Sequence, residues 1–250
     1  MKALILSDLH SNIRALEAIW TREQDSDAIY CAGDLVDYGP YPNAVLDWVR
    51  QRRVVCVQGN HDREVIHYYR TGATGADVPL AERKWAHYNA GLLREEDIVF
   101  LEQLPPAASL TLDGVRYGMT HFYRGYNEIV SLHAYTRFCA ATFADGDAPL
   151  PNRLIFGHTH RQAVRYLSDT QLWLNPGSIS YRRPDDPDQT AHYITITDSV
   201  ISLQRLAYDL EPVWRAARAV PLKVSEAVAA ERFFPLELIG HRCSRGIKRG

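Results

Sequence analysis

No apolar run in the sequence approaches the ~20 residues that a membrane-spanning helix requires, so we expect no membrane segment. The strong basic excess that is typical of proteins binding the nucleic-acid backbone is also missing. The 250 residues include 28 lysines and arginines against 30 aspartates and glutamates, which gives a net charge of −2. Met1-Lys2 leads directly into an apolar stretch without a signal-peptide pattern. We therefore expect a cytoplasmic protein without a nucleic-acid partner.

Cysteine is scarce, and its spacing contains no metal or redox motif. The chain has four cysteines, Cys31, Cys56, Cys139 and Cys243, and no two of them form a Cys-x-x-Cys pair. Cys31 and Cys56 lie in apolar stretches typical of buried strands, where free cysteine acts as a small apolar side chain. We interpret these cysteines as core residues of a protein in a reducing compartment.

The overall amino-acid composition, 46% hydrophobic and 23% charged, is typical of a folded globular protein. The length is sufficient for one large α/β domain, and we predict a single domain over residues 1–250. Within it we expect a helical insert at about 62–104. Terminal helices and a basic tail are expected at about 211–250.

Strands and helices alternate in the first third of the chain. Apolar stretches predict strands at residues 2–7, 27–32 and 53–58. Asn12, Pro42 and Asp62 are residue types that favour helix starts, and each follows one of these strands. This βαβαβ order predicts a parallel, right-handed, doubly wound sheet.

The rest of the chain has a helical pattern followed by a β pattern. Pro79 is a typical first residue of a helix, which we predict to extend to about Leu93. Asp113-Gly114 separates two strand-like stretches and predicts a hairpin. Further strands, spaced like a β-meander, are expected at 163–167, 171–174, 191–197 and 200–206.

Short acidic and histidine motifs follow the predicted strands. Gly33 permits a tight turn that presents Asp34 at the end of its strand, the edge where open α/β sheets bind ligands. The motifs, in chain order, are Asp8-Leu9-His10, Gly33-Asp34-Leu35-Val36-Asp37, Gly59-Asn60-His61-Asp62, His121 and Gly157-His158-Thr159-His160. Each motif is weak alone, but the ordered series predicts a metal site, and we expect it to hold two metals.

This ordered series resembles the calcineurin-like metallophosphoesterase superfamily, over residues 3 to about 206. Asn175-Pro176-Gly177-Ser178, after a late strand, is most similar to the small prokaryotic phosphodiesterase-like branch. The resemblance implies an α/β fold built as a four-layer α/β/β/α sandwich, with two mixed β-sheets flanked by helices. It also implies a dinuclear phosphoesterase in which a metal-bridging hydroxide attacks the phosphate ester.

The same resemblance implies the metal ligands, with Asp34 as a bridge between two divalent ions. The ligands of the first metal would be Asp8, His10, Asp34 and His160. Those of the second would be Asp34, Asn60, His121 and His158. A shared carboxylate offsets the repulsion between cations ~3.5–4 Å apart. Oxygen and imidazole ligands without thiolate favour Mn²⁺, with Fe or Zn²⁺ as alternatives.

His61 is the motif histidine that the metals do not need. It resembles the acid of the family, which protonates the leaving oxygen or stabilises its charge. Asp37 is the expected partner that orients His61 and favours its imidazolium form. Asp62 could be the partner of His61 instead of Asp37. Alternatively, Asp62 caps the helix that follows it.

The chain departs from the protein phosphatases of the superfamily at Tyr38, where they carry an arginine that clamps a terminal phosphate. We therefore expect a small phosphodiester or nucleotide-type substrate, contacted by Asn12, Tyr38 and Arg63. A serine/threonine protein phosphatase-like monoesterase remains an alternative. A non-catalytic scaffold on the same fold is a second alternative, although it would be expected to have lost ligands or His61. A homo-oligomer is left open.

Overall fold

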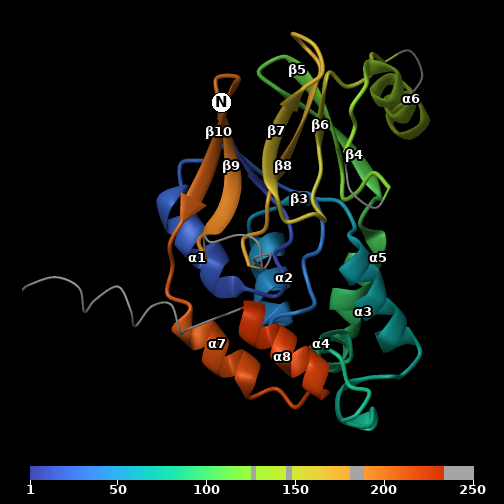
Figure 1. The fold of residues 1–250 in the computed structure, drawn as a ribbon, viewed down its shortest axis with the longest axis vertical. Helices are drawn as coiled ribbons and strands as arrows, with labels where there is room; N and C mark the ends of the chain where they lie inside the picture. Colours follow the sequence, from blue (N-terminus) through green and yellow to red (C-terminus); the bar gives the residue numbers. More distant parts are fainter. Residues whose placement is uncertain (125–127, 145–147, 181–188, 234–250) are drawn as a thin grey trace, which may run out of the picture.

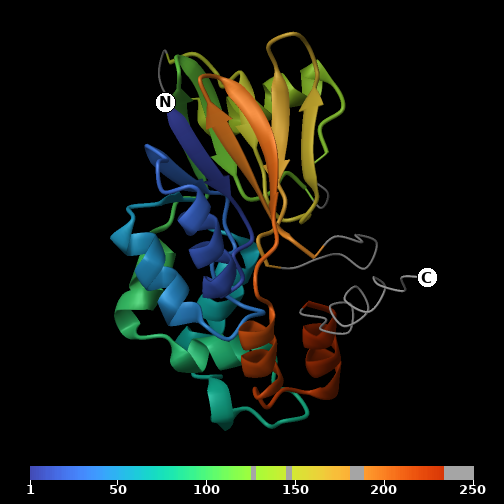
Figure 2. The same ribbon diagram turned by 90° about the vertical axis from the view of Figure 1, so that its left-hand side faces the viewer.

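Two five-stranded sheets form the centre of the molecule, and the helices lie outside them (Figure 1). The computed structural model describes residues 1–124, 128–144, 148–180 and 189–233, so the predicted basic tail lies outside the described residues. In Figure 2 the sheets occupy the upper part of the molecule and most helices the lower part.

The first sheet has the strand order β10-β9-β1-β2-β3. Its strands are β1 (Lys2–Leu6), β2 (Ala28–Cys31), β3 (Val55–Cys56), β9 (Ala191–Thr197) and β10 (Val200–Leu206). β1 pairs parallel with β2, and β2 pairs parallel with β3, which confirms the predicted parallel start of the chain. β9 pairs antiparallel with both β1 and β10, so the sheet is mixed.

The second sheet, also mixed, has the order β4-β5-β6-β8-β7. Its strands are β4 (Ala107–Leu112), β5 (Val115–Thr120), β6 (Arg153–Ile155), β7 (Gln162–Tyr166) and β8 (Leu172–Pro176). The predicted hairpin between β4 and β5 is confirmed. Asp113 and Gly114 both have positive φ, 49° and 77°, as the favoured two-residue hairpin turn requires.

The predicted β-meander over the last four strands is wrong. β7 and β8 pair in the second sheet, whereas β9 and β10 pair in the first. The two hairpins separate because β8 lies beside the parallel strand β6, and β9 lies beside β1 in the other sheet. Local spacing therefore identified the hairpins but not the sheet to which each belongs.

Alternation along β1 shows how the layers are built. Leu4 and Leu6 face a core that the helices cover, while Ala3 and Ile5 face the core between the two sheets. Successive side chains of a strand point to opposite faces, so one strand contributes to both cores. The four-layer α/β/β/α sandwich is thereby confirmed.

The outer helices divide between the two sheets. On the first sheet lie α1 (Ile13–Arg22), α2 (Pro42–Gln51), α3 (Asn60–Arg70), α4 (Trp85–Leu92) and α5 (Glu95–Gln103), with a short 3₁₀ turn, η1 (Gly75–Asp77), between α3 and α4. On the second sheet lies α6 (Leu132–Phe143). No helix among the described residues is long and apolar enough to cross a membrane.

The helix predicted to start at Pro79 starts instead at Trp85. The preceding residues form a compact loop, in which the Arg83 guanidinium donates hydrogen bonds to the carbonyls of Val78 (2.8 Å) and Ala76 (3.3 Å). The backbone N–H of Lys84 then donates to Nδ1 of His87 (3.0 Å) and caps the first turn of α4. These contacts outweigh the preference of proline for a helix start.

The terminal helices α7 (Glu211–Arg218) and α8 (Val224–Phe233) lie at the lower end of the molecule in both ribbon views. Val213 and Leu222 join a buried cluster around Trp85, and Tyr38 packs against the edge of that cluster. The C-terminal helices therefore support the loop that carries Asp37 and Tyr38.

Candidate metal centre

Left-handed backbone conformations at the strand ends direct several side chains of the candidate centre toward a common region. Five predicted ligand residues have left-handed φ angles: Asp8 (53°), His10 (45°), Asp34 (56°), His158 (67°) and His160 (56°). For residues with a Cβ such angles cost on the order of 1 kcal/mol or more each, and they concentrate at functional sites. The loops after β1, β2 and β6 therefore hold a strained, specific geometry.

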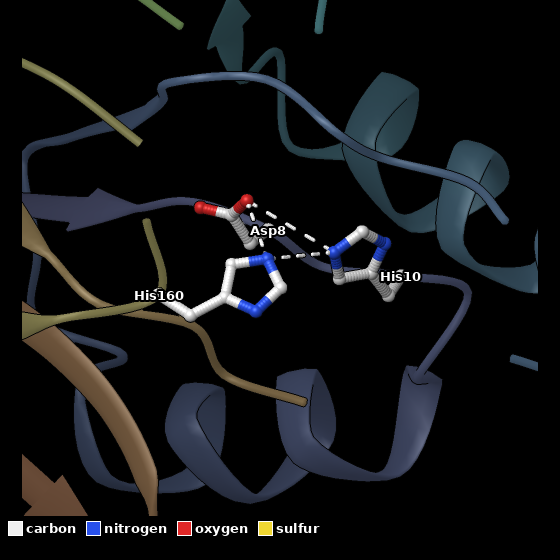
Figure 3. A group of neighbouring side chains, drawn as sticks. All are labelled: Asp8, His10 and His160. Atoms are coloured by element: carbon white, nitrogen blue, oxygen red, sulfur yellow. Dashed lines mark hydrogen bonds and ion pairs between the residues drawn. The ribbon is translucent and has the colours of Figure 1, made fainter. Parts of the chain in front are cut away.

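Asp8, His10 and His160 form the first cluster of potential ligands (Figure 3). Nε2 of His160 lies 3.1 Å from Oδ1 of Asp8 and 3.2 Å from Nε2 of His10. Nε2 of His10 lies 3.9 Å from Oδ1 of Asp8. Ligands bound at ~2.0–2.2 Å to one ion lie about 3–3.5 Å apart, so this triangle suits a single cation.

Asp34, His121 and His158 form the second cluster, and Asn60 lies among them. Nε2 of His121 lies 3.1 Å from Oδ2 of Asp34 and 3.0 Å from Oδ1 of Asn60. Nδ1 of His158 lies 2.9 Å from the same Asn60 oxygen. The other ring nitrogen of His121 lies 2.7 Å from the carbonyl of Ala32. Donation from Nδ1 to that carbonyl directs Nε2 toward the other potential ligands.

The protonation states of His10 and Asp34 suit cation binding. Burial, reinforced by neighbouring His160, lowers the pKa of His10 to about 3, so its imidazole is neutral at pH 7. Burial raises the pKa of Asp34, but the nearby histidines, chiefly His121, outweigh it and hold the pKa below its usual value. Oδ2 of Asp34 is buried, and its 3.1 Å contact with Nε2 of His121 joins two potential ligand atoms. A cation would satisfy this atom.

Asp34 also acts on the first cluster, because its charge raises the pKa of His10 against the effect of burial. The two clusters are therefore electrostatic neighbours. Neutral imidazole, carboxylate and amide oxygen form a donor set suited to divalent Mn, Fe or Zn. The residues present fit a metal pair.

His61 pairs with Asp37 rather than with Asp62. Its Nδ1 lies 2.7 Å from Oδ2 of Asp37, and its ring centroid lies 5.2 Å from that of His10. Burial lowers the pKa of His61, but the hydrogen bond to Asp37 and the charge of Asp34 outweigh it and raise the pKa to about 10. His61 is thus a protonated side chain beside the first cluster.

Asp62 has a structural role that the sequence indicated only in part. It caps α3 by accepting the N–H of Gly59 (2.8 Å), in line with the capping alternative. It also accepts the N–H groups of Asp34 (3.1 Å), Leu35 (2.8 Å) and Val36 (3.2 Å), and so fixes the loop after β2. A Cβ at Gly59 would lie 2.0 Å from Oδ1 of Asp34, so this close approach requires glycine.

Two asparagines fix other loops of the candidate centre through hydrogen bonds. Oδ1 of Asn89, on α4, accepts hydrogen bonds from the Asp37 N–H (3.1 Å) and the Ser11 hydroxyl (2.6 Å). Nδ2 of Asn175 donates to the carbonyl of Gly157 (2.7 Å), directly before His158. The Asn-Pro-Gly-Ser sequence signalled Asn175, but no local pattern signalled Asn89.

The predicted substrate-binding residues lie in different environments. Asn12 is fully buried; its Oδ1 caps α1 at Ala15 (3.1 Å) and its Nδ2 donates to the Tyr208 hydroxyl (2.8 Å). This burial leaves Asn12 without exposed surface for a substrate to contact. The Tyr38 ring lies 4.6 Å from the His61 ring, at the site. Arg63 is exposed, with its guanidinium 5.7 Å from the ring of Phe122.

Comparison with known proteins agrees with this architecture. An uncharacterized protein of Methanocaldococcus jannaschii is 27% identical over 234 residues, which cover 84% of this chain and 89% of that protein. The crystal structure of a metallophosphoesterase from Sphaerobacter thermophilus is 25% identical, with a TM-score of 0.70 over 93% of this chain and 99% of that one. A hypothetical protein of Pyrococcus horikoshii OT3, at 14% identity, shares the fold, with a TM-score of 0.72 over 93% and 98% of the two chains.

The sequence model of one family matches residues 1–199, which contain both clusters and the His61–Asp37 pair. That family is described as the calcineurin-like phosphoesterase superfamily domain. The match covers most of the chain, and the chain belongs to the calcineurin-like phosphoesterase superfamily.

Proposed function

We propose that this chain hydrolyses a small phosphodiester or a nucleotide-type phosphate with two divalent cations. The observation that carries the proposal is the pair of ligand clusters lying beside a protonated His61 held by Asp37. The first ion would be held by Asp8, His10 and His160. The second would be held by Asn60, His121 and His158. Asp34 would bridge the two ions.

When bound, such cations lower the pKa of water and withdraw charge from phosphoryl oxygens. The residues of the chain supply the proton donor for the leaving oxygen and the group that orients it. The Asp37 carboxylate holds Nδ1–H of His61 and stabilises its positive charge. The other ring nitrogen of His61 is then available to give its proton to the leaving oxygen, a step in which general acids typically contribute about 10²–10⁴-fold.

Mn²⁺ is the cation that we propose first, because the donors are carboxylate, amide and imidazole without thiolate. Fe and Zn²⁺ accept the same donors. The three free cysteines within the described residues, Cys31, Cys56 and Cys139, are buried and belong to neither cluster.

Tyr38 favours a diester over a phosphoprotein monoester. Its ring lies beside His61, in the place where a guanidinium would clamp a doubly charged terminal phosphate. Burial, followed by the charges of Asp37 and Glu226, raises the pKa of the Tyr38 phenol, so this side chain is neutral and cannot replace that clamp. A singly charged diester needs the clamp less.

The metal assignment is tested with Asp34→Asn. We expect metal-reconstituted wild-type protein to contain two ions per chain and to hydrolyse bis-nitrophenyl phosphate faster than a phosphopeptide. Asp34→Asn should lose both ions together, whereas Asp169→Asn, in an exposed turn between β7 and β8, should keep them. Elemental analysis that finds one ion fully retained in Asp34→Asn would contradict the bridge. A preference for the phosphopeptide would favour the monoesterase alternative.

A further inference from the structure

A basic, aromatic cavity lies outside the two ligand clusters. It has a volume of about 270 Å³ and is lined by Tyr123, Arg124, His133, Ala134, Arg137 and Phe138. The lining combines two guanidinium groups, an imidazole and two aromatic rings, and it includes no acidic side chain. Such a lining attracts an anion and offers flat surfaces to a ring.

This cavity is adjacent to the candidate metal centre. Tyr123 follows His121 by two residues, so their Cα atoms are at most about 7.6 Å apart. Phe122, between them in sequence, has its ring centroid 6.0 Å from that of His121 and 5.5 Å from that of His158. The Tyr123 ring also lies 6.5 Å from that of Phe156, two residues before His158. The cavity and the second cluster are therefore close neighbours.

The arginines of the cavity differ from several arginines on the helix surfaces. Arg70 pairs with Glu95 and Glu102, and Arg94 pairs with Asp97. By contrast, neither Arg124 nor Arg137 has a carboxylate within 4.0 Å in the described part of the chain. The guanidinium of Arg124 lies over the ring of Tyr123, with its central carbon 5.1 Å from the ring centroid.

The His61 side of the centre carries paired charges. A carboxylate oxygen of Glu64 lies within 4.8 Å of ligand atoms of both His61 and Asp37. Lys84 pairs with Glu64 at 3.2 Å, and His61 pairs with Asp37 at 2.7 Å, so both carboxylates have a cationic partner. The proposed acid therefore directs the leaving oxygen to the His61 side, and the guanidinium groups of the cavity, without a carboxylate partner among the described residues, favour an anionic end of the substrate that stays on the phosphorus.

We propose that the cavity between Tyr123 and α6 binds the second, anionic and ring-bearing end of an extended substrate, as a nucleotide presents it. The proposal rests on the proposed hydrolysis at the metal centre. Guanidinium groups bind phosphate in a bidentate manner, and they stack on aromatic rings. A volume of about 270 Å³ is near the ~300 Å³ lower limit of small-molecule pockets, which suits one nucleotide-sized end and excludes a protein segment.

The kinetic test compares a long and a short substrate. In the double variant Arg124→Gln/Arg137→Gln, the KM for a dinucleoside tetraphosphate should rise about tenfold or more with kcat nearly unchanged, as expected when binding is lost equally in the ground state and the transition state. Both constants for bis-nitrophenyl phosphate should stay at the wild-type values. Arg215→Gln, which changes an exposed arginine of α7, is the matched control. An equal change for both substrates, or no change for either, would overturn the proposal.

A binding test separates this inference from the proposed hydrolysis. Metal-stripped wild-type protein and Arg215→Gln should bind adenosine diphosphate in calorimetry, and the double variant should bind it at least about tenfold more weakly. Ribose 5-phosphate, which lacks the aromatic base, should bind more weakly than adenosine monophosphate. Equal affinity of wild type and double variant would overturn the cavity assignment. Absence of hydrolysis in metal-loaded wild type would overturn the proposed function while leaving the binding result to decide on the cavity.

Discussion

At the scale of single residues, neighbouring charge decides which histidines are protonated. Burial lowers the pKa of every histidine in the candidate centre whose shift is resolved. His10, beside another histidine, stays low, at about 3. His61 and His121 each face a carboxylate that outweighs burial, and their pKa values are raised to about 10 and about 9. The same residue type thus supplies a ligand at one position and an acid at another.

The raised pKa of His121 makes metal binding depend on pH. Without a cation, His121 is protonated at pH 7, because its pKa of about 9 lies above that pH. A ligand imidazole must be neutral, so binding releases this proton. We expect the affinity of the second ion to rise by about tenfold per pH unit from 7 to 9. Calorimetry in two buffers of different ionisation enthalpy would measure the proton release; a pH-independent affinity would contradict the assignment of His121.

The assignment of His61 as the acid predicts a substrate-dependent loss. His61→Ala should keep both metals but lose about 10²–10⁴-fold in rate on esters with poor leaving groups. Nitrophenyl esters should lose much less, because nitrophenolate scarcely needs a proton. The comparison of kcat between an alkyl diester and bis-nitrophenyl phosphate measures this difference. An equal loss on both would indicate a role in binding or in positioning the metals.

At the scale of elements, one carboxylate joins the start of α3 to the loop after β2. Asp62 accepts four backbone N–H groups, from Gly59, Asp34, Leu35 and Val36. The loop it fixes carries Asp34 in a left-handed conformation, with φ at 56°. Removal of the carboxylate would leave these buried donors without a partner and release the loop.

This connection predicts a large effect from a residue outside both ligand clusters. Asp62→Ala should lower the free energy of unfolding by about 3 kcal/mol or more, because hydrogen bonds to a charged group contribute about 1.5–3 kcal/mol each. Urea unfolding of the metal-free protein measures this loss without the contribution of the ions. Asp62→Asn, which keeps one acceptor oxygen, should lose less. Equal stability of Asp62→Ala and wild type would show that the loop does not depend on the clamp.

The alternation of strands and helices at the start of the chain was predictable because its signals are local. Asn12 caps α1 and Pro42 opens α2, as their residue types indicate. The start of α4 was not predictable, because it depends on the particular contacts of Arg83 in the preceding loop. Asn89 was missed for a related reason: it binds the N–H of Asp37, 52 residues earlier in the chain.

The separation of β7–β8 from β9–β10 into two sheets was not predictable for the same reason. Each hairpin has a local signal, but its sheet is decided by pairing with β6 or β1, which are distant in sequence. The strand-end ligands were predictable because parallel neighbours expose their carboxyl ends at a common edge. Which of them lie together, as Asp8 and His160 do at 3.1 Å, depends on how the two sheets face each other.

At the scale of the whole molecule, the candidate centre joins the two sheets. Asp8 and Asp34 follow strands of the first sheet, whereas His121 and His158 follow strands of the second. The core between the sheets is apolar and includes Ile5 of β1. At the edge that carries the centre, contacts between potential ligands, such as that of His160 with Asp8 at 3.1 Å, join the two sheets. Cations bound there would connect both halves of the sandwich.

Removal of the metals should therefore lower the stability of the whole fold. Ions that bind the native state alone stabilise it by about 2.7 kcal/mol per site at a free concentration of 100 Kd. For a chain of this size, 1 kcal/mol shifts Tm by about 2–4 °C, so each site should contribute about 5–10 °C. Thermal unfolding followed by circular dichroism, with saturating Mn²⁺ and with a chelator, measures the difference. Asp34→Asn, expected to bind neither ion, should show the same Tm in both conditions. A wild-type Tm that does not change on chelation would show that the ions do not connect the sheets.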